Sequence, residues 1–117
     1  MRVIVAAAGT AGHINPGLAI ANKIKEKEPN SEIIFIGTTR GLENVLVPRA
    51  GYELKTIEAY GLSKQISIEN LKKICTTLKA TGKARKIIQQ FKPDVIVGAG
   101  GYICGPVVWA AKKENRY

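Results

Sequence analysis

Two glycine-rich segments are the parts of this chain best suited to chemistry. The first covers residues 7–17 and ends in Asn15-Pro16-Gly17, and the second covers residues 98–106 and ends in Gly105-Pro106. Each follows an apolar run and reaches a proline where a helix can begin, because proline's fixed φ and missing N–H suit the first helical position. Glycines let the backbone N–H groups turn inward, and a helix N-terminus adds positive potential. The pattern therefore predicts two loops that bind a phosphate or diphosphate.

The elements that carry these loops alternate between strand and helix. Strands are predicted at residues 2–7, 33–36, 52–57 and 94–97. The second is apolar throughout, as in a parallel sheet covered on both faces, and the third alternates between polar and apolar residues. Helices are predicted over 16–28 with Asn15 as N-cap, over 42–47 with a stop before Pro48, over 68–91, and from near Pro106 onward.

This alternation predicts an α/β fold, a Rossmann-like doubly wound parallel sheet with right-handed crossovers and strand order 3-2-1-4. In that order the first and fourth strands are neighbours at the topological switch point, where open α/β sheets bind ligands. The two glycine-rich segments follow those two strands. We therefore expect both segments to face one crevice.

Composition and targeting signals narrow the class of protein. The chain has 117 residues, enough for one domain, and its 45% hydrophobic and 23% charged residues are ordinary for a globular protein. It lacks an apolar stretch of the roughly 20 residues that span a membrane, and its start does not resemble a signal peptide. We expect the protein to stay in the cytoplasm. Cys75 and Cys104 are too far apart in sequence for a metal motif and are interpreted as reduced thiols.

The net charge of +9 is concentrated in one segment. Between Lys64 and Lys92 there are eight basic residues against Glu69 alone, which accounts for +7 of the total. On a helical wheel this segment has two apolar stripes, Ile68, Leu71, Ile74, Cys75 and Leu78 on one side and Ala84, Ile87, Ile88 and Phe91 on another. One straight helix cannot bury both in one core, so either Gly82 breaks the helix or one stripe faces outward.

The second stripe runs into the fourth strand and is expected in the core. That leaves the first stripe as a membrane-associating candidate, an apolar patch flanked by lysines that suits an anionic lipid surface. Its residues are Leu71, Lys72, Cys75, Leu78 and Lys79. The alternative is a helix–helix contact beside a solvated basic face. Nucleic acid is disfavoured as a partner, because Phe91 is the only aromatic residue of the segment and no nucleic-acid motif is present.

Several motifs together resemble the N-terminal acceptor domain of MurG, a family of peptidoglycan glycosyltransferases. They are Gly9-Thr10-Ala11-Gly12-His13 with Pro16-Gly17, Gly98-Ala99-Gly100-Gly101-Tyr102 with Gly105-Pro106, Lys92-Pro93-Asp94-Val95, Gly37-Thr38 and Leu46-Val47-Pro48. The resemblance covers nearly all of residues 1–117. It implies one half of a GT-B enzyme, with no metal or other cofactor.

The resemblance also implies an activity and a location. Such enzymes transfer N-acetylglucosamine from UDP-GlcNAc to undecaprenyl-pyrophosphoryl-MurNAc-pentapeptide in peptidoglycan synthesis, at the cytoplasmic face of the bacterial cell membrane, where they are peripheral proteins. A second, donor domain supplies most of the nucleotide-sugar pocket. We therefore expect this chain to be an isolated acceptor domain that transfers no sugar by itself.

Site residues follow from the same resemblance. His13 is the catalytic candidate, either as general base for the acceptor hydroxyl or as a hydrogen-bond partner of the pyrophosphate; the alternative is a histidine that only caps local backbone. Thr10, Ala11 and Gly12 match the segment that touches UDP-GlcNAc. The residues implied for the acceptor pyrophosphate are Gly9, Gly12, His13, Gly100, Gly101 and Tyr102, and for Tyr102 the alternative is packing on the sheet.

The first segment departs from the family pattern, and there are two functional alternatives. Ala8 and Ala11 stand where the family is usually richer in glycine, so Ala11 must adopt a conformation that a Cβ permits. The main functional alternative is a non-catalytic, membrane-associated module that binds a lipid pyrophosphate or a partner protein. A dinucleotide-dependent oxidoreductase is disfavoured, because the first segment is not Gly-X-Gly-X-X-Gly and the second segment would be left unexplained.

Overall fold

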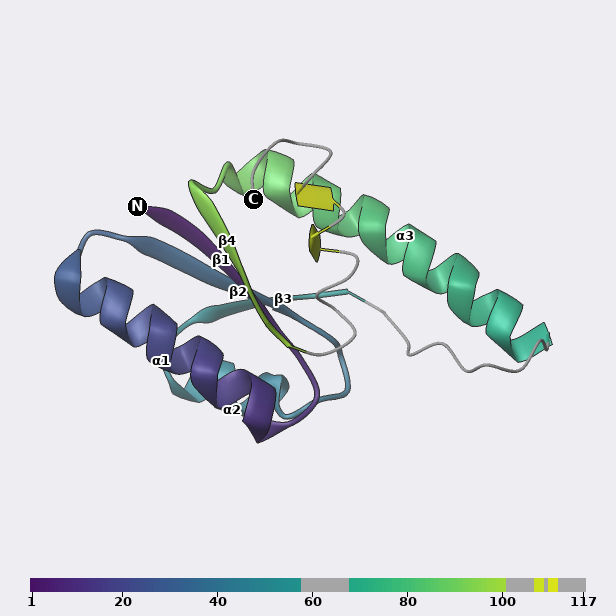
Figure 1. Ribbon diagram of the computed structural model, residues 1–117, viewed down its shortest axis with the longest axis horizontal. Coiled ribbons are helices and arrows are strands. Elements are labelled where there is room, and N and C mark those ends of the chain that lie inside the picture. The colour runs from purple at the N-terminus through teal and green to yellow at the C-terminus, as the bar shows by residue number, and fades with distance from the viewer. Residues whose placement is uncertain (58–67, 101–106, 109, 112–117) are drawn as a thin grey trace.

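Four parallel strands form one sheet in the computed structural model, which describes residues 1–57, 68–100, 107–108 and 110–111, with only the backbone described for 68–78 and 80. The strands are β1 (Arg2–Ala7), β2 (Glu32–Gly37), β3 (Glu53–Thr56) and β4 (Val95–Gly100), and their order is β3-β2-β1-β4 (Figure 1). The predicted fold class and strand order are confirmed. The helices are α1 (Ala11–Lys27), α2 (Glu43–Arg49) and α3 (Ile68–Phe91).

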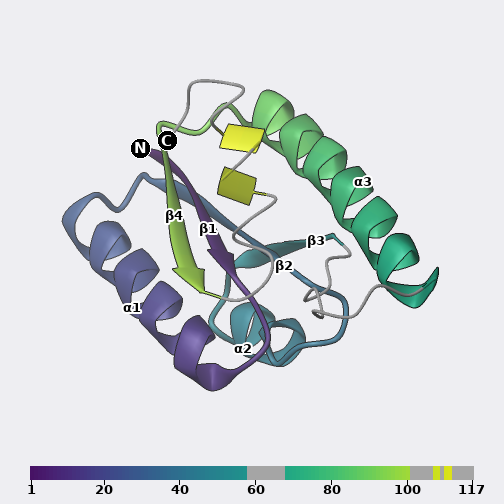
Figure 2. The same ribbon diagram turned by 45° about the vertical axis from the view of Figure 1, so that its right-hand side comes forward.

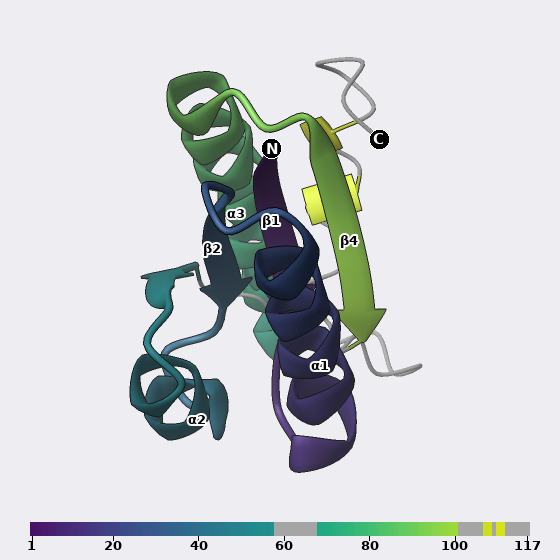
Figure 3. The ribbon, with the colours of Figure 1, turned by 90° about the vertical axis from the view of Figure 1, so that its left-hand side faces the viewer.

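Helices cover both faces of this sheet. In Figure 3, α1 lies in front of the strands and α3 lies behind them, and Val47 of α2 belongs to the core on the α1 side. Alternate residues of β1 and β2 therefore point into two separate cores, and both strands are apolar along most of their length. Ile4, Ala6, Ile34 and Ile36 pack on the α3 side with Ala84 and Ile88, whereas Val3, Val5, Ile33 and Phe35 pack on the α1 side with Ile14, Ala21 and Val47.

The long helix α3 is continuous through Gly82, so of the two alternatives for this segment the break at Gly82 is wrong. Ala84 and Ile88 are fully buried, and Ile87 and Phe91 are partly buried against the same core, which confirms the second stripe as core. The amino-terminal half of α3 extends beyond the strands (Figure 1). Lys79 is exposed there, while the side chains of Leu71, Lys72, Cys75 and Leu78 lie outside the described residues.

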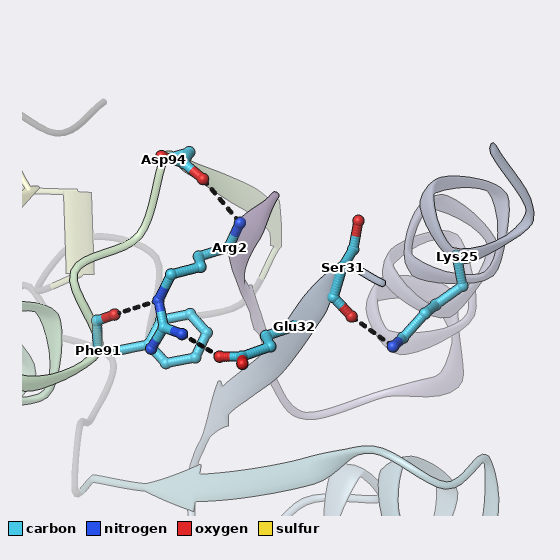
Figure 4. A network of polar contacts seen from close by, with 6 residues as sticks. All are labelled: Arg2, Lys25, Ser31, Glu32, Phe91 and Asp94. Atoms are coloured by element: carbon cyan, nitrogen blue, oxygen red, sulfur yellow. Dashed lines mark hydrogen bonds and ion pairs between the residues drawn. The ribbon is translucent and has the colours of Figure 1, made fainter. Parts of the chain in front are cut away.

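A polar network fastens the amino-terminal edge of the sheet (Figure 4). The backbone N–H of Arg2 donates to an Asp94 carboxylate oxygen at 2.8 Å, and the Nε of the Arg2 side chain donates to the Phe91 carbonyl at 2.7 Å. The guanidinium also pairs with Glu32 and lies 4.2 Å from the centroid of the Phe91 ring. One side chain therefore joins β1, β2 and the end of α3, at the edge opposite the glycine-rich segments.

Three predicted boundaries are wrong, two at prolines and one at the end of a strand. Helix α1 begins at Ala11 rather than Pro16, with Thr10 rather than Asn15 as N-cap, so Pro16 lies inside the helix. Pro48 likewise lies inside α2. A proline's φ fits a helix, and near a helix end the missing N–H costs a single backbone hydrogen bond. Strand β4 continues to Gly100, because its pairing with β1 extends to Ala7 after a register shift.

Candidate functional site

The carboxyl ends of β1 and β4 meet at the topological switch point of the sheet. The two strands pair in parallel, and the Ala8 N–H donates to the Gly100 carbonyl at 3.2 Å, so the two glycine-rich segments are joined directly. Both strands run toward the start of α1 in Figure 2. Gly9 and Gly100 have φ values of +97° and +128°, which residues with a Cβ rarely adopt. The described parts of the two segments therefore lie side by side, as the strand order predicted, and the shared crevice stays a prediction.

The first turn of α1 contains the residues predicted to meet a nucleotide sugar. Thr10 is extended, and its carbonyl accepts the N–H groups of His13 and Ile14 at 3.0 and 3.1 Å. Its hydroxyl makes no cap hydrogen bond. Ala11 and Gly12 follow as the first two helical residues, and amides at these positions have no carbonyl partner within a helix. The helix start therefore combines donors with the positive end of the helix dipole.

His13 lies in this first turn, whereas the predicted helix start at Pro16 would place it before the helix. Its Nδ1 is 3.1 Å from the Ala8 carbonyl oxygen, and a carbonyl only accepts hydrogen bonds. The geometry therefore assigns the proton of the neutral ring to Nδ1, which leaves Nε2 as an acceptor. The ring also lies against Gly100, where a Cβ would be 2.5 Å from His13 Cδ2. This hydrogen bond to Ala8 is the contact expected of a histidine that only caps local backbone. It is also compatible with Nε2 acting as a base.

Close packing brings α1 down onto the two strands. A Cβ at Gly17 would lie 3.1 Å from Val5 Cγ1 and 3.4 Å from the Ala99 Cβ, so a larger residue would lift the helix. Ala11 is helical, which a Cβ permits, and the left-handed backbone falls on Gly9 instead. Gly101 and Tyr102 lie outside the described residues, as does Cys104.

The residue that sequence reasoning missed is Glu43, the first residue of α2. Its side chain is fully buried, and its Oε2 accepts the Gly9 N–H at 3.2 Å and the Thr38 N–H at 3.1 Å. The available signal was an acidic residue at a helix start, where carboxylates are favoured. No pattern in the sequence places this carboxylate beside a loop that lies 34 residues earlier.

Other features of the described residues do not form a second candidate site. A pocket of about 280 Å³ lies between α3 and strands β2 and β3. Two basic residues in its lining are already paired with carboxylates, Arg2 with Glu32 and Lys55 with Glu53. No three His, Cys, Asp or Glu side chains among the described residues are placed to hold a metal ion. In the described part of the chain, no helix is both long and apolar enough to span a membrane.

Comparison with known proteins assigns this chain to a class. The model of the glycosyltransferase family 28 N-terminal domain matches residues 3–116. The chain therefore belongs to this family of glycosyltransferases, as its N-terminal domain.

Relatives define the branch of the family. A relative from Alkaliphilus oremlandii is 50% identical over 113 residues and is named UDP-N-acetylglucosamine–N-acetylmuramyl-(pentapeptide) pyrophosphoryl-undecaprenol N-acetylglucosamine transferase. A relative of the same name from Acetivibrio thermocellus is also 50% identical over 113 residues. Each match covers 97% of this chain and 31% of the relative.

Solved structures support the same branch of the family. The crystal structure of Acinetobacter baumannii MurG superposes with a TM-score of 0.84 at 31% identity, covering 98% of this chain and 33% of that one. The resemblance to MurG is confirmed. A UDP-N-acetylglucosamine 2-epimerase structure from Listeria monocytogenes, at 12% identity and a TM-score of 0.68, shares the fold alone. The chain spans about a third of the length of the MurG relatives that it matches.

Proposed function

We propose that this chain is the acceptor-binding half of an N-acetylglucosaminyltransferase of peptidoglycan synthesis. Its substrates would be UDP-GlcNAc and undecaprenyl-pyrophosphoryl-MurNAc-pentapeptide, the compounds that the relatives' names imply. The observation that carries the proposal is the junction of the two glycine-rich segments beneath the start of α1, with His13 held between them. The nucleotide-sugar pocket is completed by a donor domain, and this chain alone transfers no sugar.

The roles divide along the two segments. The Thr10 hydroxyl and the amides of Ala11 and Gly12 face the donor, and Gly12, His13 and Gly100 line the acceptor pyrophosphate with Gly101 and Tyr102. Gly9 contributes the tight turn of the loop and not a hydrogen bond from its N–H to the pyrophosphate, because that N–H donates to Glu43. A helix N-terminus favours the negative charge of a diphosphate without a metal ion.

His13 acts as the general base. The acceptor hydroxyl oxygen attacks the anomeric carbon of GlcNAc, the bond from that carbon to the UDP oxygen breaks, and UDP leaves with the bonding electron pair. The hydroxyl proton passes to His13 Nε2, the nitrogen that the Ala8 contact leaves unprotonated. The imidazolium that forms keeps its Nδ1–H bonded to the Ala8 carbonyl.

The lipid-linked substrate also requires a membrane surface. We propose that the amino-terminal half of α3 provides it through Leu71, Lys72, Cys75, Leu78 and Lys79, and that the protein is peripheral at the cytoplasmic face of the membrane. Two observations support this: Lys79 is exposed, and this half of α3 extends beyond the sheet (Figure 1). Each lysine near an anionic surface contributes about 1 kcal/mol.

The test is reconstitution of the transferase. The chain is combined with the donor domain of the Alkaliphilus oremlandii relative, UDP-GlcNAc and a short-chain lipid acceptor, and GlcNAc transfer is measured. His13→Ala should lower kcat by about 100-fold or more while UDP-GlcNAc affinity is unchanged. Lys23→Ala, an exposed change on the same helix, should leave turnover intact.

Two results would contradict the proposal. Unchanged turnover of the His13→Ala enzyme would remove the catalytic role of that residue. Lipid pyrophosphate binding without sugar transfer in the wild-type mixture would instead favour a non-catalytic binding module.

A further inference from the structure

Glu43 has a carboxylate with no exposed surface, and several hydrogen-bond donors surround it. Besides the two backbone N–H groups at its Oε2, the Thr38 hydroxyl lies 3.4 Å from the same oxygen. Burying a charge is costly unless donors compensate it. The donors come from two segments, the first glycine-rich loop and the turn between β2 and α2. The carboxylate therefore joins these segments at the edge of the sheet where the candidate site lies.

The surrounding backbone leaves room for this carboxylate and little else. A Cβ at Gly37 would lie 2.6 Å from Glu43 Cγ, and a Cβ at Gly41 would lie 1.7 Å from its Oε1 and 2.8 Å from the Gly9 nitrogen. The Leu42 N–H donates to the Gly9 carbonyl at 3.2 Å. Both backbone groups of Gly9 are thus bonded to the segment that carries Glu43.

A single peptide unit connects Glu43 to the catalytic candidate. The Gly9 N–H that donates to Glu43 and the Ala8 carbonyl that faces His13 Nδ1 belong to the same planar amide. Rotating this plane would break both contacts together. A carboxylate on its N–H end also polarises the carbonyl, which strengthens the bond that the carbonyl accepts.

We infer that Glu43 is a positioning residue, which holds the Ala8–Gly9 peptide so that His13 keeps its proton on Nδ1 and presents Nε2 to the substrate hydroxyl. This inference deepens the proposed function and rests on it for the use of Nε2. Glu43 itself touches no substrate. Sequence separation hides the connection, because Glu43 lies 34 residues after Gly9, whose N–H its carboxylate accepts.

The experiment compares Glu43→Gln, Glu43→Ala and wild type by ¹⁵N NMR of the His13 ring in the ligand-free chain. Gln keeps an acceptor for the Gly9 N–H but loses the charge, whereas Ala removes both. We expect the Nδ1–H tautomer to predominate in wild type and to lose about fivefold against Nε2–H in the Ala variant, with Gln between them. Glu53→Gln, an exposed acid on β3, is the control and should match wild type.

The same variants are then measured in the reconstituted transferase. Glu43→Gln should lower kcat with little change in KM for UDP-GlcNAc. Ring shifts that are identical in folded wild type, Gln and Ala variants would overturn the inference, since a residue that only stabilises the fold would leave the tautomer unchanged. If Ala fails to fold, the Gln spectrum decides.

The inference and the proposed function can fail separately. A wild-type mixture that transfers no sugar would refute the proposed function, while the ring measurement in the ligand-free chain would still decide whether Glu43 sets the tautomer. Equal or higher kcat in Glu43→Gln would show that the buried charge opposes the reaction, and would overturn the inference from the catalytic side.

Discussion

At the scale of residues, the site depends on glycines, which have no Cβ, as much as on its functional side chains. Gly100 has no Cβ where His13 Cδ2 needs the space, and Gly41 has none where Glu43 lies. The imidazole and the carboxylate are therefore held on opposite sides of the Ala8–Gly9 peptide. A glycine-rich sequence here makes room for specific side chains as well as for a ligand.

Replacement of Gly100 by alanine tests this arrangement. We expect Gly100→Ala to lower the free energy of unfolding by about 1–3 kcal/mol, because the residue has φ +128° and its Cβ would overlap the His13 ring. The His13 ring resonances should move with it. Denaturant unfolding and NMR measure the two effects.

The matched control is Gly82→Ala within α3, where a Cβ would meet no atom within 4 Å. That change should raise stability by about 0.5–1 kcal/mol, because alanine is the better helix former. Equal effects of the two substitutions, or an unmoved His13 ring in Gly100→Ala, would contradict the packing described.

At the scale of elements, α1 is anchored to its neighbours at both ends. Its start is joined to β1 and β4 through His13, and farther along, the Tyr52 hydroxyl donates to Asn22 Oδ1 at 2.6 Å. The Tyr52 ring also lies 5.3 Å from the Phe35 ring, centroid to centroid. These contacts join α1 to the residue that precedes β3 and to β2.

The Tyr52 contact predicts a dependence on pH. Burial raises the pKa of the Tyr52 phenol in the folded chain above the value of about 10 for free tyrosine. As pH rises past that unfolded value, the unfolded chain releases the proton first and the folded chain still keeps it. The unfolded state then binds fewer protons, so the free energy of unfolding falls with rising pH.

Tyr52→Phe should remove this part of the alkaline loss of stability. We expect the melting temperature of the variant to fall less steeply than that of wild type above about pH 10, although the variant also lacks the bond to Asn22 at every pH. Thermal unfolding followed by circular dichroism between pH 8 and about 11 gives both slopes. Identical slopes would contradict a raised pKa for Tyr52.

At the scale of the whole molecule, the candidate site and the proposed membrane-binding helix lie on different elements. The candidate site lies at the carboxyl edge near α1 and α2, and α3 covers the opposite face with its amino-terminal half beyond the strands (Figures 1 and 3). A helix that projects in this way can meet a membrane without covering the site.

The membrane proposal predicts a specific loss of binding. Leu71→Ser with Leu78→Ser should reduce binding to phosphatidylglycerol vesicles by about tenfold or more, since burial of each leucine contributes about 1.5–3 kcal/mol. Vesicle sedimentation measures it. Binding should also weaken with added salt and be weaker to neutral phosphatidylcholine vesicles.

The control is Leu42→Ser with Val45→Ser, because these exposed apolar residues lie on and beside α2, on the other face of the sheet. The control should bind like wild type. Intact binding by the Leu71 and Leu78 variant, or an equal loss in the control, would remove α3 as the membrane-binding element.

Most of the architecture could be predicted from local pattern. Apolar runs and turn residues recur along the chain, so the strands, the order β3-β2-β1-β4 and the full extent of α3 follow from periodicity and the rules for parallel sheets. Helix starts were harder, because a proline such as Pro16 fits either the first or a later position of a helix.

The sequence by itself determined the fold and the meeting of the two glycine-rich segments, because motif spacing and strand order are properties of the chain. Only the tertiary structure decided that Glu43 is buried against the Ala8–Gly9 peptide and that His13 Nδ1 faces the Ala8 carbonyl. The Glu43 contact joins residues 34 apart in sequence, and the His13 contact is local but depends on how the loop folds, so neither hydrogen-bond geometry exists before the fold has formed.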